Sequence, residues 1–456
     1  MTDPVERQSE ADQLVSRGGE RAELIVRGAR LLDPRGGLDA ERDLVVRGGE
    51  IAELAEPGAA AALEDAEVVD GEGLLLLPGF VDPHVHFRVP GQEHKEDLET
   101  GTRAAAAGGY CAVIAMANTA PPIDSASVLG SIRERAEREA SVPTGFVATV
   151  TRGMAGEDLT EMAELREGGA AGFSDDGLPI RSARVLRRAL QYQRLAGGVI
   201  ALHEEDPELS GDGVMHEGEV SALLGMAGIP AVSESTMIER DCELALYEGA
   251  RVHIQHLSAR GSVEAVARAK SAGVQVTCEA TPHHLTLTDE AVRSLDSRFK
   301  MNPPLRSEDD RQALIDGLRE GTIDCVATDH APHALEEKEV PFEQAAMGVT
   351  GLETAFAALH TELVLPGTLG LELLAERMTA GGEPFGIEAP RLEVGRAANL
   401  ALIDPKLEWV VGEDGYESRS ANSCFAGREL TGRVLMTVAD GRVAFRQRSF
   451  AMGVAG

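Results

Sequence analysis

The chain has 456 residues, of which 43% are hydrophobic, so it is long enough to bury a large core. A formal net charge of −33 argues against binding to nucleic acid or to an anionic membrane, because both are themselves negatively charged. Its five cysteines are scattered and form no C-x-x-C pair, which argues against a disulfide framework or a thiolate zinc site.

The N-terminal stretch MTDPVERQSEADQLVSRGGE is polar and charged, and it has no apolar segment of the kind found in signal peptides. We interpret residues 1–20 as a disordered acidic tail. The apolar run GLLLLPGFV further along is too short to cross a bilayer. The sequence therefore predicts a cytoplasmic protein without membrane segments.

Residues 21–76 alternate apolar and polar side chains around glycine turns, as in RDLVVRGGEIAEL, and residues 391–456 repeat this pattern in TGRVLMTVADGRVAF. Such alternation is typical of antiparallel strands with one buried face. We expect these two ends of the chain to pair into one discontinuous β-sandwich domain.

Residues 77–390 repeat one unit, in which a helix-like stretch is followed by glycine and a short apolar strand, as in YQRLAGGVIALH and LREGTIDCVATDH. Glycine favours the end of a helix, and such apolar runs suit strands buried on both faces. The strand candidates number about eight, which predicts an α/β fold with a closed (β/α)8 TIM-like barrel. An open doubly wound sheet is the alternative. Long segments at 207–230 and 330–348 are candidates for active-site lids.

Titratable side chains follow several predicted barrel strands, where the carboxyl ends of the strands form the active-site face. They are His84, His86, Asp175, Asp176, His203, His256 and Asp329. A lone histidine is more often a surface or hydrogen-bonded residue than a metal ligand. Alternate residues of a strand face the same side, however, so His84 and His86 should project together into the barrel mouth.

Histidine nitrogens and carboxylate oxygens together suit zinc, and a shared carboxylate can bridge two ions. Such a site without cysteine ligands is expected to be catalytic, with the metal producing hydroxide at neutral pH. The residues therefore predict a metal-dependent hydrolase.

Several motifs give the chain a resemblance to a known family. In chain order they are PGFVDPHVHFRVPG, MANT, FSDDG, HEGE, HIQH, CEATPHHL, KMNPPLR, ATDHAPH and GLET. They span roughly Gly79 to Ala355 and resemble the longer bacterial type of dihydroorotase, in the amidohydrolase superfamily. The resemblance implies the reversible, zinc-dependent cyclisation of N-carbamoyl-L-aspartate to L-dihydroorotate in pyrimidine biosynthesis.

The resemblance also implies metal ligands for two zinc ions. One ion would be bound by His84, His86 and Asp329, and the second by His203 and His256. The family's bridging position matches Asp176, which leaves Asp175 a structural role. A bridging hydroxide would be the nucleophile, with Asp329 as general acid and base.

Substrate contacts are implied in the same way. Arg88, Asn118 and His333 match the partners of the substrate carboxylate, Asn302 matches a ring contact, and the backbone near Met347 and Gly348 matches another. Taken alone, each asparagine is as typical of a turn as of a ligand contact, and Arg88 is more typical of a surface ion pair.

Two alternatives remain open at this point. The first is a hydrolase of another cyclic amide, such as a hydantoinase, dihydropyrimidinase or allantoinase, which places a carboxylated lysine at the bridge; GGAAGFSDDG contains no lysine. The second is an inactive scaffold subunit of aspartate transcarbamoylase, but such proteins lose metal ligands that are all present here. We expect a small-molecule substrate and a homo-oligomer, and the resemblance raises association with aspartate transcarbamoylase.

Overall fold

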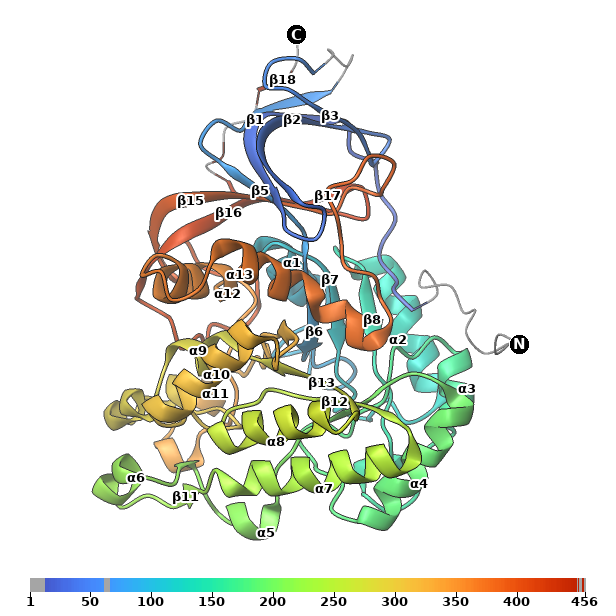
Figure 1. The fold of residues 1–456 in the computed structure, drawn as a ribbon, viewed down its shortest axis with the longest axis vertical. Coiled ribbons are helices and arrows are strands. Elements are labelled where there is room, and N and C mark those ends of the chain that lie inside the picture. The colour runs from blue at the N-terminus through green and yellow to red at the C-terminus, as the bar shows by residue number, and fades with distance from the viewer. Residues whose placement is uncertain (1–12, 61–65, 449, 451–452, 455–456) are drawn as a thin grey trace.

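In the computed structural model, which describes residues 13–60, 66–448, 450 and 453–454, a barrel surrounded by helices adjoins a curved sheet (Figure 1). Strands from the two ends of the chain pair with one another in that sheet, whereas the middle of the chain forms the barrel. This arrangement confirms the predicted fold class.

The sheet takes strands from both ends of the chain. Its N-terminal strands are β1 (Leu24–Asp33), β2 (Leu38–Arg47), β3 (Glu50–Ala55), β4 (Glu67–Asp70) and β5 (Leu75–Pro78). Its C-terminal strands are β15 (Leu400–Val410), β16 (Glu429–Ala439), β17 (Arg442–Arg446) and β18 (Gly453–Val454). The strand order β17-β16-β15-β5-β1-β2-β3 places β5 against β15, with Leu400 opposite Pro78 in an antiparallel pair. The alternating pattern thus buries one face from each end of the chain in a shared core, which includes Leu31, Leu76, Leu402 and Met436.

The barrel consists of short parallel strands. They are β6 (Phe80–Val85), β7 (Tyr110–Ala115), β8 (Thr144–Phe146), β9 (Ile200–Leu202), β12 (Arg251–Ile254), β13 (Gln275–Ala280) and β14 (Cys325–Val326). Isolated bridges from Phe173 to Ala148 and to Ile200 connect β8 to β9, and a bridge from Val85 to His330 joins the first strand to the last. The ring is therefore closed, and the open-sheet alternative is wrong.

The fourth barrel position is a single residue, Phe173, with a bridge to each neighbouring strand, where the sequence predicts a strand. The carboxylate of Asp175 accepts the backbone N–H groups of Val150 and Thr151, at 2.8 and 3.1 Å, and also the Thr151 hydroxyl. A side chain thus takes the place of the backbone ladder here, which explains why so little regular strand forms.

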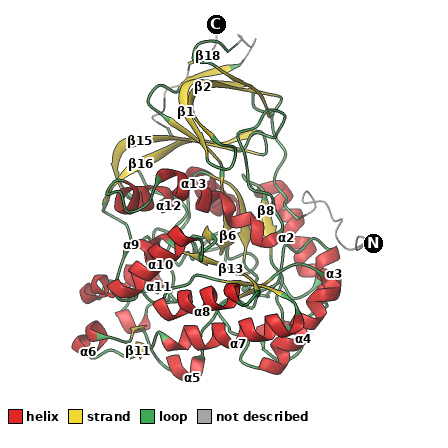
Figure 2. Cartoon of the chain, in the orientation of Figure 1, coloured by secondary structure: helices red, strands yellow, loops and turns green. Residues whose placement is uncertain are grey.

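Helices cover the outside of the barrel (Figure 2). They include α1 (Leu98–Ala107), α2 (Ala126–Glu139), α3 (Met162–Glu167), α4 (Ala183–Ala196), α7 (Val232–Glu248), α8 (Arg260–Ser271), α10 (Glu308–Glu320) and α13 (Leu371–Thr379). In α4, residues Val185, Leu186, Ala189 and Leu190 are buried at helical spacing, and Ser182 caps the first turn. Gly249 and Gly321 end α7 and α10 with left-handed φ of 63° and 84°, as the glycine-after-helix pattern predicts.

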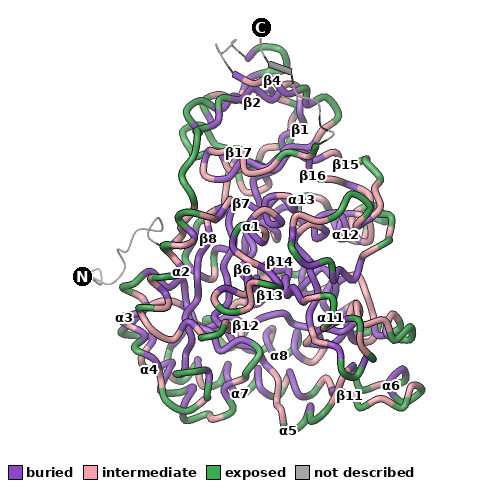
Figure 3. Tube along the Cα trace, turned by 180° about the vertical axis from the view of Figure 1, so that it is seen from behind, coloured by how far each residue is buried: buried purple, intermediate pink, exposed green. Residues whose placement is uncertain are grey.

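Short elements complete the chain between these helices. They are α5 (Pro207–Ser210), β10 (Met215–His216), α6 (Glu219–Leu224), β11 (Gly228–Ile229), α9 (Pro282–Thr286), α11 (Leu335–Lys338), α12 (Ala355–Leu359), the π-helical η7 (His360–Val364), and the 3₁₀ turns η3 (Arg152–Met154), η4 (Asp289–Ser294), η5 (Ser297–Phe299), η6 (Phe342–Gln344) and η8 (Ala380–Phe385). The segment 207–230 is therefore built of short helices and a small two-stranded sheet, and the segment 330–348 of short helices and turns. Figure 3 shows that the central strands are buried whereas the outer faces of the helices are exposed.

Both chain ends also contact the barrel. Residues 1–12 of the predicted tail lie outside the described residues, but Val15 pairs with Thr144 through backbone hydrogen bonds of 3.0 and 2.8 Å. Near the other end, Cys424 and Phe425 pack with Met215 and Phe342 of the barrel loops. No helix within the described residues is long and apolar enough to cross a membrane.

Candidate metal centre and active site

The predicted ligands lie at the carboxyl ends of the barrel strands, and the ligand atoms of several of them converge. His84 lies in β6, and the others follow the end of a strand or of the bridge at Phe173. All are buried: His84, His86, Asp176, His203, His256 and Asp329 are at most 6% exposed. The fold thus gathers side chains that are up to 245 positions apart in the sequence, from His84 to Asp329.

One group of atoms gathers around His84 and His86. The Nε2 atom of His86 lies 3.1 Å from Oδ1 of Asp329, and Nε2 of His84 lies 3.6 Å from the same oxygen. Asp176 faces this group with both oxygens, Oδ1 at 3.5 Å from His84 Nε2 and Oδ2 at 3.4 Å from His86 Nε2.

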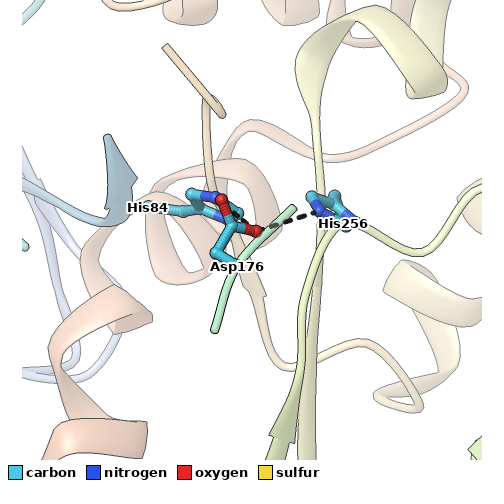
Figure 4. A group of neighbouring side chains, drawn as sticks. All are labelled: His84, Asp176 and His256. Carbon is cyan, nitrogen blue, oxygen red and sulfur yellow. Dashed lines mark ion pairs between the residues drawn. The ribbon is translucent and has the colours of Figure 1, made fainter. Parts of the chain in front are cut away.

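A second group adjoins it on the other side of Asp176. The Nδ1 atom of His203 and the Nε2 atom of His256 are 2.9 Å apart, and each lies 3.7 Å from Oδ1 of Asp176. Figure 4 shows the Asp176 carboxylate between His84 and His256. The second aspartate of FSDDG therefore lies between the two groups, whereas Asp175 bonds to the backbone of residues 150 and 151.

The residues present fit a bound divalent cation. Asp176 Oδ1 and His84 Nε2 are buried and have no hydrogen-bond partner within the described residues, although they point at each other. A buried acceptor oxygen and an imidazole nitrogen in this position both gain from a shared cation. The nitrogen and oxygen donors, without thiolate, are those that zinc accepts in catalytic sites.

Electrostatics favour a cation here as well. Burial alone would raise the pKa of Asp176, but the charge on His84 and the close approach of the His256 and His84 rings hold it well below its usual range. Burial is likewise outweighed at Asp329, whose pKa is lowered to about 2 by the hydrogen bond and charge of His86 and the charge of His84. Both carboxylates are therefore ionised at neutral pH, and they create a negative field inside the barrel mouth.

Neighbouring acceptors orient the histidines of the first group. Nδ1 of His84 lies 2.7 Å from Oε1 of Glu279, and Nδ1 of His86 lies 2.9 Å from Oδ1 of Asn118. Because Glu279 can only accept when ionised, the Nδ1–H of His84 donates to it, and the neutral ring then has its lone pair at Nε2, toward the centre. Asn118 also donates from Nδ2 to Oδ2 of Asp176 at 3.2 Å.

Backbone strain is concentrated at this site. Six described residues other than glycine have a positive φ, and three of them are Arg88 (59°), His256 (30°) and Asp329 (46°). Such conformations are costly for residues with a Cβ atom and persist where the surrounding structure holds them. At these strand ends the fold therefore keeps unfavourable backbone conformations, which set the direction of the three side chains.

The predicted substrate contacts lie on the loops around the same centre. Arg88 donates from Nε to the Pro332 carbonyl at 3.1 Å, and one of its terminal nitrogens is 3.5 Å from Nε2 of His333. That Nε2 also lies 2.9 Å from the carbonyl oxygen of Met347. Asn302 is further round the rim, where its Nδ2 donates to Oε2 of Glu205 at 2.6 Å.

Several buried groups that hold the loops were not found from the sequence. Lys338 donates from Nζ to the carbonyl of Gly348 at 2.9 Å, and Asn422 donates to the same carbonyl at 3.1 Å. Asn422 also accepts the backbone N–H of His333 at 3.2 Å. The only sequence signal for Lys338 and Asn422 is a polar residue within a loop, so their role is visible only in three dimensions.

Comparison with known proteins agrees with the arrangement of these residues. The family model described as "Dihydro-orotase-like" matches residues 73–262. A dihydroorotase of Trichlorobacter lovleyi is 44% identical over 93% of this chain and 100% of its own length, and one of Pelotomaculum thermopropionicum is 45% identical over 93% and 99%. The chain belongs to the dihydroorotase family. Membership of this family makes it an enzyme, a cyclic amide hydrolase.

Solved structures extend the likeness of the fold beyond the dihydroorotase family. L-hydantoinase (dihydropyrimidinase) from Arthrobacter aurescens superposes with a TM-score of 0.83 at 26% identity, over 95% of this chain and 98% of that one. Dihydropyrimidinase from Brevibacillus agri gives 0.81 at 22% identity, over 94% and 96%. The barrel and the β-domain are thus common to dihydroorotases and these enzymes, and the fold alone does not separate their substrates.

Proposed function

We propose that this member of the dihydroorotase family interconverts N-carbamoyl-L-aspartate and L-dihydroorotate at the metal centre formed by its barrel strands. The observation that carries this proposal is that candidate metal ligands and a cationic side chain lie together at the carboxyl ends of the barrel strands. Buried histidine and aspartate ligands converge at the centre, and an arginine and a histidine lie 3.5 Å apart beside it. An anionic cyclic amide needs both the metal and the cationic partner.

Zinc is the metal that the donor set supports. His84, His86 and Asp329 would hold one ion, His203 and His256 a second, and Asp176 would be shared between them. A bound divalent cation supplies Lewis acidity, which polarises the ring carbonyl and makes water a better nucleophile at neutral pH. His203 and His256 would hold their ion together, because Nδ1 of one and Nε2 of the other lie only 2.9 Å apart.

Asp329 is the group that moves the proton in this proposal. Its pKa of about 2 keeps it ionised near neutral pH, so its carboxylate can accept a proton from the attacking water. As the oxygen of water bonds to the ring carbonyl carbon and the carbon–nitrogen bond breaks, the same proton passes to the departing nitrogen. Ring closure runs these transfers in reverse.

The substrate carboxylate would be bound by Arg88 together with Asn118 and His333. Arg88 uses Nε and one terminal nitrogen in its described hydrogen bonds, so its remaining nitrogen has donors left for an anion. Asn302 supports the ring contact, because its Oδ1 is buried without a hydrogen-bond partner in the described part of the chain. A ring N–H of the substrate would satisfy that oxygen, and the backbone of Met347 and Gly348 would border the ring.

Metal content and turnover of dihydroorotate, measured together, test the proposal. Asp176→Ala should lose at least one zinc and nearly all activity, whereas Asp212→Ala, at an exposed position in the 207–230 segment, should keep both. Hydantoin, dihydrouracil and allantoin are the competing substrates. Activity on these three without activity on dihydroorotate would overturn the proposal, as would a fully active Asp176→Ala variant.

The proposal also includes a homo-oligomeric assembly and a cytoplasmic location. Leu195 and Tyr247, 73% and 75% exposed near the C-terminal ends of α4 and α7, are candidate contacts of the oligomer. All five cysteines are buried and free, which supports a reducing cytoplasm. Association with aspartate transcarbamoylase would be checked by sedimentation of the mixed proteins.

A further inference from the structure

Glu205 lies two residues beyond His203, on the loop that leaves β9 toward α5, and it is only 19% exposed. We infer that Glu205 is a positioning residue that ties the orientation of the metal ligand His203 to that of the ring-binding residue Asn302. This inference rests on the proposed function, because it takes its two partners in the roles proposed above. It concerns a side chain to which neither the motifs nor the family resemblance gave a role.

One oxygen of Glu205 serves both partners. Oε2 lies 2.6 Å from Nδ2 of Asn302 and 3.4 Å from Nε2 of His203. Ser210, the last residue of α5, also hydrogen-bonds to the Glu205 side chain. The carboxylate therefore joins the segment after β9, which carries His203 and Ser210, to the KMNPPLR motif, whose Asn302 is 97 residues further along the chain than Glu205.

The contact with His203 fixes which ring nitrogen is free. Nδ1 of His203 faces the centre, 2.9 Å from Nε2 of His256, and it must carry a lone pair to bind a cation. The ring proton must then lie on Nε2, and the group facing Nε2 is the acceptor Glu205. Glu205 thus does for His203 what Glu279 does for His84 on the opposite side of the centre.

The contact with Asn302 fixes the orientation of its amide. An ionised carboxylate can only accept hydrogen bonds, so the NH₂ group of Asn302 must face Glu205 and the carbonyl oxygen must point away. That oxygen is the buried Oδ1 without a partner. Without Glu205 the amide could rotate and present NH₂ to the substrate, where an acceptor is required.

Glu205→Ala and Glu205→Gln separate the two effects. Alanine removes the shared oxygen, whereas glutamine can place its amide oxygen there and its NH₂ toward Ser210, whose hydroxyl can accept. We expect Glu205→Ala to weaken zinc binding in chelator competition by roughly 10–100-fold, the range typical of lost partners of metal ligands. It should also raise KM for dihydroorotate about tenfold, corresponding to one neutral hydrogen bond. Glu205→Gln should recover most of both losses.

Combining Glu205→Ala with Asn302→Ala tests whether the rise in KM acts through Asn302. There, Glu205→Ala should still weaken zinc binding but should raise KM no further, since its substrate effect acts through Asn302. Glu208→Gln, at an exposed position on α5, is the matched control and should change neither quantity. Urea unfolding of the metal-free variants separates these effects from a general loss of stability.

The outcomes are distinct from those that test the proposed function. A wild-type protein without zinc or dihydroorotate turnover would overturn the proposed function, and this inference with it. An active, zinc-loaded wild type with Glu205→Ala within twofold of it in zinc affinity and KM would overturn the inference alone. An equal rise of KM in the presence and absence of the Asn302 side chain would also overturn it.

Discussion

Replacing Glu279 in β13 should weaken both the metal-free fold and metal binding. Its side chain is fully buried and accepts three hydrogen bonds, from His84 Nδ1 at 2.7 Å, His253 Nε2 at 2.9 Å and the backbone N–H of His256 at 3.2 Å. Burial alone would raise the pKa of Glu279, but the charge on His84 and the hydrogen bonds from His253 and His84 lower it. The carboxylate is therefore an ionised acceptor that holds residues from β6 and β12.

The size of the effect follows from these three bonds. Glu279→Leu keeps most of the volume but leaves three buried donors without a partner, which should cost about 3–5 kcal/mol of unfolding free energy. Glu279→Gln can keep one oxygen for His84 and for the His256 backbone, so only the His253 contact is lost and the cost should be about 1–3 kcal/mol. Zinc affinity should fall by roughly 10–100-fold in the leucine variant and less in the glutamine variant.

Urea unfolding of the metal-free proteins measures the first quantity, and chelator competition measures the second. Glu99→Gln is the control, because Glu99 forms an exposed pair with Arg103 on α1 at 3.4 Å, and its loss should stay within about 0.5 kcal/mol. If Glu279→Leu unfolded at the wild-type urea concentration, or if it bound zinc as tightly as the wild type, the reasoning would be refuted.

Three further predictions concern the proton carrier, the carboxylate clamp and the pH dependence of stability. Asp329→Asn should lower kcat by about 10²–10⁴-fold while the fold is kept, and turnover at wild-type rates would exclude Asp329 as the proton carrier. Arg88→Lys should raise KM for dihydroorotate about tenfold or more with zinc content unchanged, because lysine keeps the charge but cannot bond the Pro332 carbonyl and an anion at once in the fixed geometry of the guanidinium; equal KM values would contradict the clamp. Burial lowers the pKa of His283 from 6.5 to about 4, so its contribution to stability is present above pH 6.5 and is lost as the pH falls toward 4. Between pH 6.5 and pH 4, the His283→Gln variant should therefore lose about 3 kcal/mol less unfolding free energy than the wild type, as measured by urea unfolding at the two pH values. Identical pH profiles for the two proteins would show the prediction to be wrong.

The sequence by itself determined the architecture, because that follows from local patterns. Glycine after amphipathic helices, buried apolar runs and alternating strands at both ends are read residue by residue, and they predicted the closed barrel and the shared sheet. The strand-end positions of His84, His86 and Asp329 were predicted in the same way, since every parallel strand of a barrel delivers its carboxyl end to one face.

Only the tertiary structure decided which side chains hydrogen-bond to the same atom. Nothing in the spacing of His203, Glu205 and Asn302 indicates that one carboxylate oxygen lies against both partners, because Asn302 lies on a different loop, 97 residues from Glu205. The same holds for Asn422, which lies in the C-terminal part of the chain and yet holds the loop that carries His333. Local sequence patterns determine helices and strands, whereas hydrogen bonds between loops form only when the complete fold brings distant segments together. In this protein, such bonds orient the residues around the candidate metal centre.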